Sequence, residues 1–386
     1  MPSEPDETPT LAVIGGGQLA RMMQQAAIPL GIRLQLLAEG ADVSAAQVVP
    51  GATVGDYRDL PTLRRAVEGC AAVTFDHEHV PTEHLVALEA DGVACRPGPQ
   101  ALVHAQDKAV MRERLTQLGV PCPRWSSVAT PDELDAVADG LGGYPVVLKT
   151  TRGGYDGKGV WFVGSAQEST PAFAAGVPLL AEERVAFARE LSVLVARSPS
   201  GQLCAYPVVE SVQQDGICVE VTAPAPNLDD ELAVQAQREA MRIATELEVT
   251  GVLAVELFET ADGRVLVNEL AMRPHNTGHW SIDGAVTSQF ENHLRAVLDL
   301  PLGDPAARAP WTVMVNILGG VGRLHDGFPH VQARDPGVRV HLYGKSVRPG
   351  RKVGHVTAYG DDLDEVRDRA RHAAAWFRGD LGEESH

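Results

Sequence analysis

The stretch GVLAVELFETADGRVLVNEL contains two glutamates that could hold a metal ion. It reads as two apolar strands around Asp262-Gly263, and an Asp-Gly pair is the strongest short-range signal for a two-residue hairpin turn. Counting outward from that turn places Glu256 directly opposite Glu269. Like charges so close are destabilising unless one is protonated or a cation lies between them. The pair predicts a divalent-metal clamp for Mg²⁺ and phosphate oxygens, and two solvated glutamates on an exposed hairpin are the alternative.

The glycine-rich loop in VVLKTTRGGYDGKGVWFV lies between two apolar strands and could bind phosphates. It is not a P-loop, because Arg152 and Gly159 stand where that motif needs glycine and Ser or Thr. A glycine hairpin can still present backbone N–H groups to phosphates, and Lys149 at the end of the first strand is a natural phosphate contact. A flexible hairpin tip with a solvated lysine is the alternative, although ordering so many glycines would cost much entropy.

The first strand and helix carry the pattern Gly15-x-Gly17-x-x-Ala20, and Glu39 ends the second strand. This pattern agrees with a dinucleotide-binding fingerprint. It is equally a tight strand-to-helix turn that holds an anion at a helix N-terminus. The motif alone does not decide between the two, but the glycine loop and the glutamate pair favour phosphate chemistry and leave no role for a nicotinamide.

Basic residues are concentrated between positions 339 and 352, where no acidic residue occurs. They are Arg339, Lys345, Arg348, Arg351 and Lys352. In a chain whose formal net charge is −18, this cluster indicates a site for an anionic substrate, and a solvated face is the alternative. Arg273, His275 and His279 lie in a loop that follows Glu269, and loops next to a metal site commonly carry binding groups.

Length and composition limit what these residues can belong to. A chain of 386 residues is too long for one ordinary domain and predicts two or three. With 44% hydrophobic and 22% charged residues it is not a disordered or collagen-like chain. The strongly negative charge argues against nucleic acid and anionic membranes as partners, and no apolar run is long enough for a membrane helix. Five scattered cysteines without a C-x-x-C pair indicate reduced thiols in a cytoplasmic protein.

The elements that must position these groups follow from the hydrophobic pattern. Strands alternating with helices predict a parallel sheet for about the first hundred residues, after an acidic, proline-rich tail. Asp107 caps a helix that ends near Leu118. A smaller α+β unit is expected over 123–184, a hairpin from strands at 190–197 and 202–209, and an amphipathic helix over 229–249. The segment from about 310 onward is expected to be mostly strand, with a closing helix.

Nine segments of the chain match the motifs of a known enzyme family. They are GGGQLARM, FDHEHVP, QDKAVMR, VVLKTTRGGYDGKGVW, YPVVE, TGVLAVELF, NELAMRPHNTGHW, MVNILG and YGKSVRPGRKVGH. With them the chain resembles the ATP-grasp superfamily and, within it, the N5-carboxyaminoimidazole ribonucleotide synthetases. The resemblance implies the fold class α/β and α+β, an ATP-grasp fold of three domains with an N-terminal parallel-sheet domain.

The resemblance also implies the domain boundaries and the reaction. A disordered tail at 1–10 precedes an N-terminal ribonucleotide-binding domain at 11–106 and a lid domain at 123–184. Residues 107–122 and 185–386 form the C-terminal ATP-grasp domain, with a small β-rich tail from about 310. The implied reaction joins bicarbonate to the exocyclic amine of 5-aminoimidazole ribonucleotide through carboxyphosphate, using ATP and Mg²⁺, in a cytoplasmic homodimer.

The resemblance assigns roles to particular residues. Those implied to bind ATP are Lys108, Lys149, Gly154, Tyr155, Asp156, Gly157, Lys158, Gly159, Val160, Glu182, Glu183, Arg184, Val185, Glu190, Gln213, Asn268 and Glu269. Glu256 and Glu269 would hold Mg²⁺. Those implied to surround bicarbonate and carboxyphosphate are Tyr155, Arg273, His275 and Lys345. Those implied to bind the ribonucleotide are Gln18, Leu19, Glu78, Asn276, Arg348, Arg351 and Lys352.

Several positions depart from the family pattern. They are Ala20, Asp76, His79, Val160 and Gln213. The last stands where the family has a histidine, and a glutamine can donate a hydrogen bond but cannot be protonated. Competing hypotheses are another ATP-grasp ligase, such as the formate-dependent phosphoribosylglycinamide formyltransferase, a Rossmann-type dehydrogenase, and an ATP-binding regulatory subunit.

Overall fold

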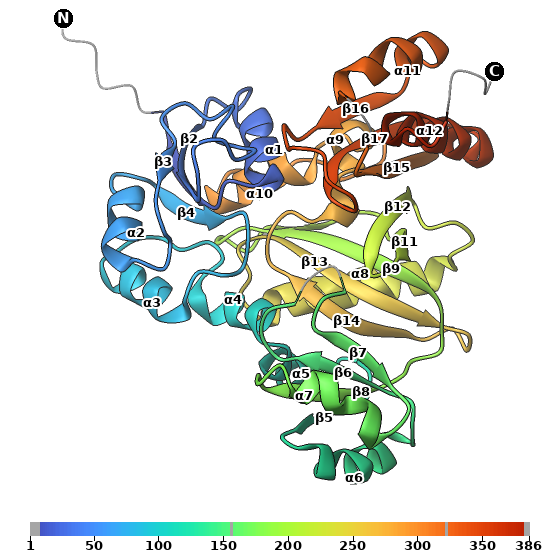
Figure 1. The fold of residues 1–386 in the computed structure, drawn as a ribbon. Helices are drawn as coiled ribbons and strands as arrows, with labels where there is room; N and C mark the ends of the chain where they lie inside the picture. The colour runs from blue at the N-terminus through green and yellow to red at the C-terminus, as the bar shows by residue number, and fades with distance from the viewer. Residues whose placement is uncertain (1–7, 155–156, 321–322, 382–386) are drawn as a thin grey trace, which may run out of the picture.

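The computed structural model describes residues 8–154, 157–320 and 323–381. Three sheets organise these residues, and each belongs to a different part of the chain (Figure 1). The N-terminal part lies at the upper left of the view, the small middle part at the bottom, and the C-terminal part at the centre and upper right. Residues 1–7 of the predicted tail, and the predicted site residues Tyr155 and Asp156, fall outside the described residues.

The N-terminal sheet is parallel throughout, in the order β3-β2-β1-β4. Its strands are β1 (Thr10–Ile14), β2 (Arg33–Ala38), β3 (Thr53–Val54) and β4 (Ala72–Phe75). The helices that follow them are α1 (Gln18–Ala27), α2 (Leu60–Val67), α3 (Thr82–Ala90) and α4 (Pro99–Gln106). The predicted parallel α/β arrangement is confirmed. Because the strands are parallel, the loops that follow β1, β2 and β4 meet at one edge of the sheet.

The predicted capped helix, α5 (Lys108–Gln117), precedes the middle part of the chain. The Asp107 carboxylate accepts hydrogen bonds from the backbone N–H groups of Ala109 at 3.0 Å and Val110 at 3.3 Å. The second sheet is antiparallel, in the order β5-β8-β6-β7. Its elements are β5 (Trp125–Val128), α6 (Pro131–Leu141), β6 (Val146–Thr150), β7 (Val160–Val163), η1 (Ala166–Ser169), α7 (Thr170–Phe173) and β8 (Leu179–Glu183).

The C-terminal part is built on one antiparallel sheet in the order β14-β13-β9-β11-β12-β15-β17-β16, with β10 pairing beside β9. Its strands are β9 (Phe187–Arg197), β10 (Leu203–Ala205), β11 (Val209–Gln214), β12 (Ile217–Ala223), β13 (Gly251–Thr260), β14 (Val265–Ala271), β15 (Trp311–Leu318), β16 (Arg339–Leu342) and β17 (Lys352–Gly360). Its helices are α8 (Asp230–Glu246), η2 (Asn276–Gly278), α9 (Ser281–Gly284), α10 (Gln289–Val297), η3 (Leu324–Gly327), α11 (Phe328–Arg334) and α12 (Leu363–Arg378). The strands from β15 onward therefore extend the large sheet.

Two sequence-based expectations differ from the fold. The strand expected over 202–209 is interrupted between Ala205 and Val209, because Pro207 has no backbone N–H to give to a ladder. The tail expected to be mostly strand contains α11, which begins with a proline in its first turn. Phe328 of this helix packs edge-on against Phe377 of α12, with ring centroids 5.5 Å apart. Tertiary packing of this kind overrides a weak local pattern.

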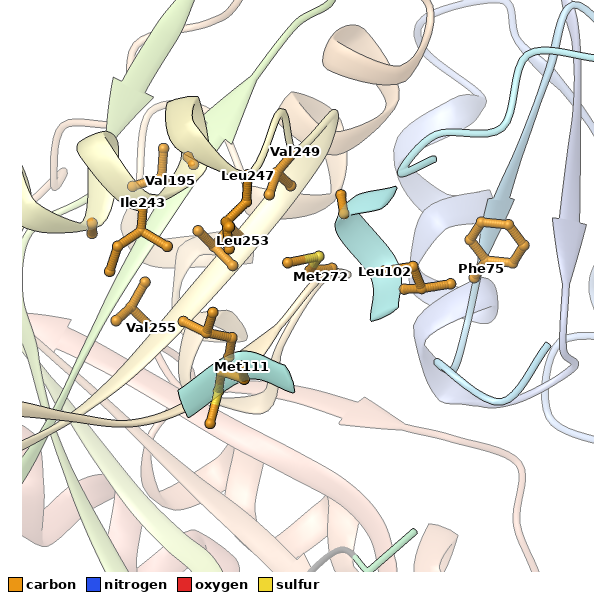
Figure 2. Close-up of a cluster of buried hydrophobic side chains, with 14 of the residues drawn as sticks. Phe75, Leu102, Met111, Val195, Ile243, Leu247, Val249, Leu253, Val255 and Met272 are labelled. Carbon is orange, nitrogen blue, oxygen red and sulfur yellow. The ribbon is translucent and has the colours of Figure 1, made fainter. Parts of the chain in front are cut away.

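A shared hydrophobic core fixes the N-terminal sheet against the large sheet (Figure 2). It runs from Phe75 on β4 through Leu102 on α4 and Met111 on α5 to Val255 on β13. The N-terminal sheet and the large sheet are thereby held in a fixed relation to each other, because a close-packed interior resists displacement. No helix among residues 8–154, 157–320 and 323–381 is long and apolar enough to cross a membrane.

Candidate active site

One large cavity, of about 1990 Å³, lies where the three parts of the chain meet. The glycine loop after β6, the connection from β8 to β9 and the β13–β14 hairpin all contribute to its lining. Most of the predicted site residues line it. They are Gln18, Leu19, Glu78, Lys108, Lys149, Gly154, Gly157, Val160, Glu182, Glu183, Arg184, Val185, Glu190, Gln213, Glu256, Asn268, Glu269, Arg273, His275, Asn276 and Lys352. Residues far apart in the sequence thus share one site.

The predicted pairing of Glu256 with Glu269 is confirmed, but the predicted turn is wrong by one residue. Thr260 pairs with Arg264, so the loop contains three residues and ends on Gly263, whose φ is +77°. The pairs next to this loop, such as Leu257 with Val267, are therefore displaced by one position. A β-bulge then follows, in which Asn268 is the extra residue of β14. The bulge cancels the displacement and restores the carboxylate pair.

Two lysines approach the pair, one from α5 and one from β6. Lys108 on α5 donates to Glu269 Oε1 at 2.6 Å, and Lys149 on β6 donates to Asn268 Oδ1 at 3.1 Å. Burial raises the pKa of Glu269, but Lys108 and Lys149 outweigh it and hold this pKa below its usual value. Glu269 is therefore a carboxylate at neutral pH, and its negative charge is directed at the cavity.

Glu256 lies in a more negative environment. Burial, the Glu269 carboxylate and Glu190 raise the pKa of Glu256 to about 8. A carboxyl group with its pKa raised by a second carboxylate has an excess of negative charge around it, which a cation would offset. The donor set fits Mg²⁺, which prefers carboxylate and phosphate oxygens. Among the described residues, no three His, Cys, Asp or Glu side chains are grouped to hold a metal, so phosphate or water oxygens would have to complete its shell.

The loop after β14 places Arg273 and His275 beside the pair. Arg273 Nε donates to Glu78 Oε2 at 2.9 Å, which joins this loop to the loop after β4. His275 Nε2 lies 3.4 Å from Glu256 Oε1, and its Nδ1 accepts from the backbone N–H of Thr277 at 3.4 Å. Burial keeps the pKa of His275 well below its usual value, so the ring is neutral. Nδ1 also lies 2.9 Å from the Thr277 hydroxyl oxygen, and when Nδ1 accepts from both Thr277 groups the proton is on Nε2, which faces Glu256.

The β8–β9 connection supplies polar groups at the other end of the cavity. Glu182 is buried, and its side chain binds Arg112 and Lys149, so only its backbone can contact a ligand directly. The Glu183 carboxylate accepts from the Arg124 backbone N–H and Nε, both at 2.8 Å. Glu190 on β9 is hydrogen-bonded to Gln213 on β11. Both residues are predicted to bind ATP. Gln213 stands where the family has a histidine, and its amide can form this hydrogen bond without a ring that could be protonated.

Three residues of the basic cluster line two different cavities. Lys345 and Arg351 line a second cavity of about 620 Å³, together with Gly17 and Asp76, whereas Lys352 lines the large one. The Lys345 ammonium donates to the Gln18 side-chain oxygen. Lys345 thus lies beside a predicted ribonucleotide contact rather than in the lining shared by Arg273 and His275. Arg348 is exposed and lines neither of these cavities. Its position therefore does not support the predicted contact with the substrate.

The backbone N–H groups of the N-terminal glycine turn bind carboxylates, whereas in a dinucleotide-binding domain they would bind a pyrophosphate. The Asp76 carboxylate accepts from the backbone N–H groups of Gly17 and Ala20, and Glu39 Oε2 accepts from the Gly16 N–H at 3.0 Å. These amides at the start of α1 are therefore already paired with carboxyl oxygens, which disfavours the dehydrogenase hypothesis. Asp76 thus has a structural role at the turn, although it departs from the family pattern.

Two functional neighbours were not found from the sequence. Asn316 on β15 is buried and exchanges side-chain hydrogen bonds with Asn276, at 2.8 and 3.2 Å. Arg112 on α5 is also buried and binds Glu182 at 2.7 Å. The available signal for Arg112 was its position four residues after Lys108, which puts both cations on one face of a helix.

Comparisons with known proteins agree with this geometry. Residues 8–106 match the ribonucleotide synthetase preATP-grasp domain, residues 113–290 the ATP-grasp domain, and residues 312–369 the phosphoribosylaminoimidazole carboxylase C-terminal domain. The N5-carboxyaminoimidazole ribonucleotide synthase of Mycobacterium tuberculosis is 57% identical over 381 residues, which cover 96% of this chain and 88% of that protein.

Solved structures give the same result. The N5-carboxyaminoimidazole ribonucleotide synthetase of Thermus thermophilus superimposes with a TM-score of 0.87 at 38% identity, covering 97% of this chain and all (100%) of the other. A synthase from Aspergillus clavatus, solved with ADP and 5-aminoimidazole ribonucleotide, gives 0.85 at 33% identity and covers 96% of this chain and 98% of the other. The predicted ATP-grasp fold with an N-terminal preATP-grasp domain is confirmed.

Proposed function

Because the chain belongs to the N5-carboxyaminoimidazole ribonucleotide synthase family of ATP-grasp ligases, we propose that it uses ATP to join bicarbonate to the exocyclic amine of 5-aminoimidazole ribonucleotide. The product is N5-carboxyaminoimidazole ribonucleotide, an intermediate of purine biosynthesis. The observation that carries the proposal is the meeting of Glu256 and Glu269 with Lys108 and Lys149 in one cavity. An opposed carboxylate pair flanked by lysines suits a metal–triphosphate group and has no comparable use in a dehydrogenase.

In the first step, a bicarbonate oxygen attacks the γ-phosphorus of ATP, the bond from that phosphorus to the β–γ bridging oxygen breaks, and ADP leaves. Glu256 and Glu269 would hold Mg²⁺, which when bound would offset the charge of the phosphate oxygens. Lys108 and Lys149 add positive charge at the same place, because phosphoryl transfer depends mainly on positioning and charge neutralisation. Gly153, Gly154 and Gly157 of the glycine loop after β6 line the same cavity, so this loop would limit the access of water to carboxyphosphate.

Arg273 and His275 would hold bicarbonate and then carboxyphosphate. Arg273 presents a fixed cation whose Nε is already oriented by Glu78. The neutral His275 would orient Glu256 through the proton on Nε2. In the second step the amine nitrogen attacks the carboxyl carbon, or CO₂ released from it, so that a C–N bond forms, phosphate leaves and the nitrogen loses a proton.

The ribonucleotide would bind where the N-terminal sheet meets the loop before β17. Gln18, Leu19 and Glu78 come from one side, and Lys345, Arg351 and Lys352 come from the other. Arg and Lys are suited to a phosphate monoester, and the local basic charge would offset the negative charge of the whole chain. Asn276, held by Asn316, would contribute an amide at the boundary with the large cavity.

ADP release by the purified chain tests this proposal. We expect release that depends on both bicarbonate and 5-aminoimidazole ribonucleotide, with carbon from labelled bicarbonate in the product. Incorporation of labelled formate into glycinamide ribonucleotide would instead identify the competing transformylase. ATP hydrolysis that is indifferent to the ribonucleotide would contradict the proposed substrate, and an absence of all turnover would favour the regulatory-subunit hypothesis.

We also propose that the protein is a cytoplasmic homodimer. Supporting the cytoplasmic location, Cys70, Cys95, Cys122 and Cys204 are free thiols. The dimer is what the resemblance to the family implies. Sedimentation velocity at several concentrations would measure the oligomeric state. A single species with the mass of one chain would contradict the dimer.

A further inference from the structure

Arg112 makes an unusual set of contacts for a charged side chain. It is 1% exposed, on a helix whose other buried side chains, Met111 and Leu115, belong to the hydrophobic core (Figure 2). Its Nε donates to Glu182 Oε1 at 2.7 Å, while its two terminal nitrogens donate to the backbone oxygens of Val267 at 3.0 Å and Asn268 at 2.7 Å. One guanidinium therefore joins β8 of the middle sheet to the bulge of β14. Burial of such a charge is tolerated only when it is fully paired.

The same carboxylate also binds Lys149. Lys149 Nζ lies 2.6 Å from Glu182 Oε2, and it also donates to Asn268 Oδ1 at 3.1 Å. Arg112, Glu182, Lys149 and Asn268 thus form a closed ring of contacts. Burial would raise the pKa of Glu182, but Arg112 and Lys149 outweigh it and hold this pKa at about 2, so the carboxylate is charged.

The charges of this ring are two positive and one negative. With Arg112 present, one cation neutralises Glu182 and the second is left over, at the face that lines the cavity. Without Arg112, Glu182 and Lys149 would neutralise each other. In a poorly screened interior, that pairing would remove most of the attraction that Lys149 exerts on a phosphate.

We propose that Arg112 is a positioning residue which neutralises Glu182 and so keeps the charge of Lys149 available to the phosphates of ATP. The inference rests on the proposed function, in which Lys149 contacts those phosphates. Arg112 itself would touch no substrate, since it is covered by protein and is absent from the linings of both described cavities.

Kinetics of single variants give the first test. Arg112→Met should raise the KM for ATP by about tenfold or more, as expected when one partner of a buried charge pair is lost, while the KM for the ribonucleotide changes little. Arg112→Lys keeps the charge but cannot reproduce the fork, and should stay within about threefold of the wild-type KM for ATP. Arg114→Met is the matched control, because Arg114 lies on the same helix but pairs with Glu246 at the surface and should not alter this KM.

A rescue experiment separates the electrostatic role from a structural one. In Arg112→Met/Glu182→Gln the negative charge is also removed, so Lys149 is no longer neutralised and the KM for ATP should return most of the way to the wild-type value. A merely structural role predicts the opposite, since the double variant loses still more buried contacts and should bind ATP no better than Arg112→Met. Failure of the rescue in a folded double variant would overturn the proposal.

The variant Lys149→Met separates the proposed role of Lys149 from that of Arg112. If Lys149→Met leaves the KM for ATP unchanged, the proposed function of Lys149 is wrong, whereas an effect of Lys149→Met without one of Arg112→Met overturns only the role of Arg112. If Arg112→Met does not fold, Arg112→Lys decides. If the KM of Arg112→Lys for ATP is near the wild-type value, the proposed charge role of Arg112 is supported. If that KM rises as much as it does in Lys149→Met, the charge role is contradicted.

Discussion

His293 Nε2 on α10 lies 2.9 Å from the hydroxyl oxygen of Thr74 on β4, and both residues are fully buried. The other ring nitrogen, Nδ1, accepts a hydrogen bond from the backbone N–H of Val252 at 3.1 Å. One neutral imidazole therefore joins the N-terminal sheet to the large sheet. Burial lowers the pKa of His293 to about 3, far below the value of about 6.5 expected in an unfolded chain.

This contact predicts a loss of stability in mild acid. Below about pH 6.5 the unfolded chain binds a proton at His293 that the folded chain does not, so the free energy of unfolding falls by about 1.4 kcal/mol per pH unit from this residue alone. Between pH 7 and pH 5 its share is roughly 2 kcal/mol. Urea unfolding at the two pH values measures the change.

The variant His293→Asn isolates this share. It should be less stable at neutral pH, because the Thr74 and Val252 contacts are impaired, but its stability should depend less steeply on pH. Other buried histidines contribute to both proteins and cancel in the comparison. If the free energy of unfolding depends equally steeply on pH in the wild type and in His293→Asn, the share assigned to His293 is wrong.

Glu269→Gln should lose most of the turnover while the fold remains intact. The neutral amide is a weaker ligand for a divalent cation than the carboxylate, and it also loses the charged contact with Lys108. Steady-state ADP release and thermal unfolding are the measurements. Asp262→Asn removes an exposed carboxylate from the tip of the same hairpin and should leave turnover unchanged. ATPase activity like that of the wild type in Glu269→Gln would remove Glu269 from the metal site.

Arg351→Ala should chiefly raise the KM for the ribonucleotide, because its guanidinium lies at the second cavity, where a phosphate would be bound. The loss of one such contact corresponds to a rise of roughly tenfold. Arg348→Ala is the matched control, three residues earlier in the same loop but outside the linings of the two cavities. An unchanged KM in Arg351→Ala, or an equal rise in both variants, would remove Arg351 from the site.

Gly263→Ala tests the observed three-residue loop. Gly263 has φ +77°, where an alanine is strained, although nothing lies within 4 Å of the added carbon. We expect a loss of about 1 kcal/mol in the free energy of unfolding. Gly263→Asn should cost less, because asparagine tolerates this backbone conformation better. Turnover should be retained in both, and a large loss of turnover would show that the loop conformation affects the carboxylate pair.

The sequence predicted those parts of the site that depend on local pattern. The cap at Asp107, the strands around Lys149 and the pairing of Glu256 with Glu269 all follow from turn chemistry and alternation. The pairing was reached with two errors that cancelled, because neither a three-residue loop nor a bulge has a reliable signature in a single sequence. Arg112 and Asn316 were missed because their importance comes from partners far away in the chain, such as Glu182, seventy positions from Arg112. The separation of Lys345 from His275 was missed for the same reason.

The bulge at Asn268 changes the direction in which neighbouring side chains of β14 point. Successive side chains of a regular strand point to opposite faces, so two neighbours cannot both reach the same ligand. Here Lys149 contacts Asn268 and Lys108 contacts the very next residue, Glu269, within one cavity, while Val267 and Leu270 on either side lie in the hydrophobic core. A single inserted residue has thus directed two neighbouring polar side chains into one cavity. Deleting Asn268 would keep the two glutamates opposed, yet would leave Lys149 without its amide partner.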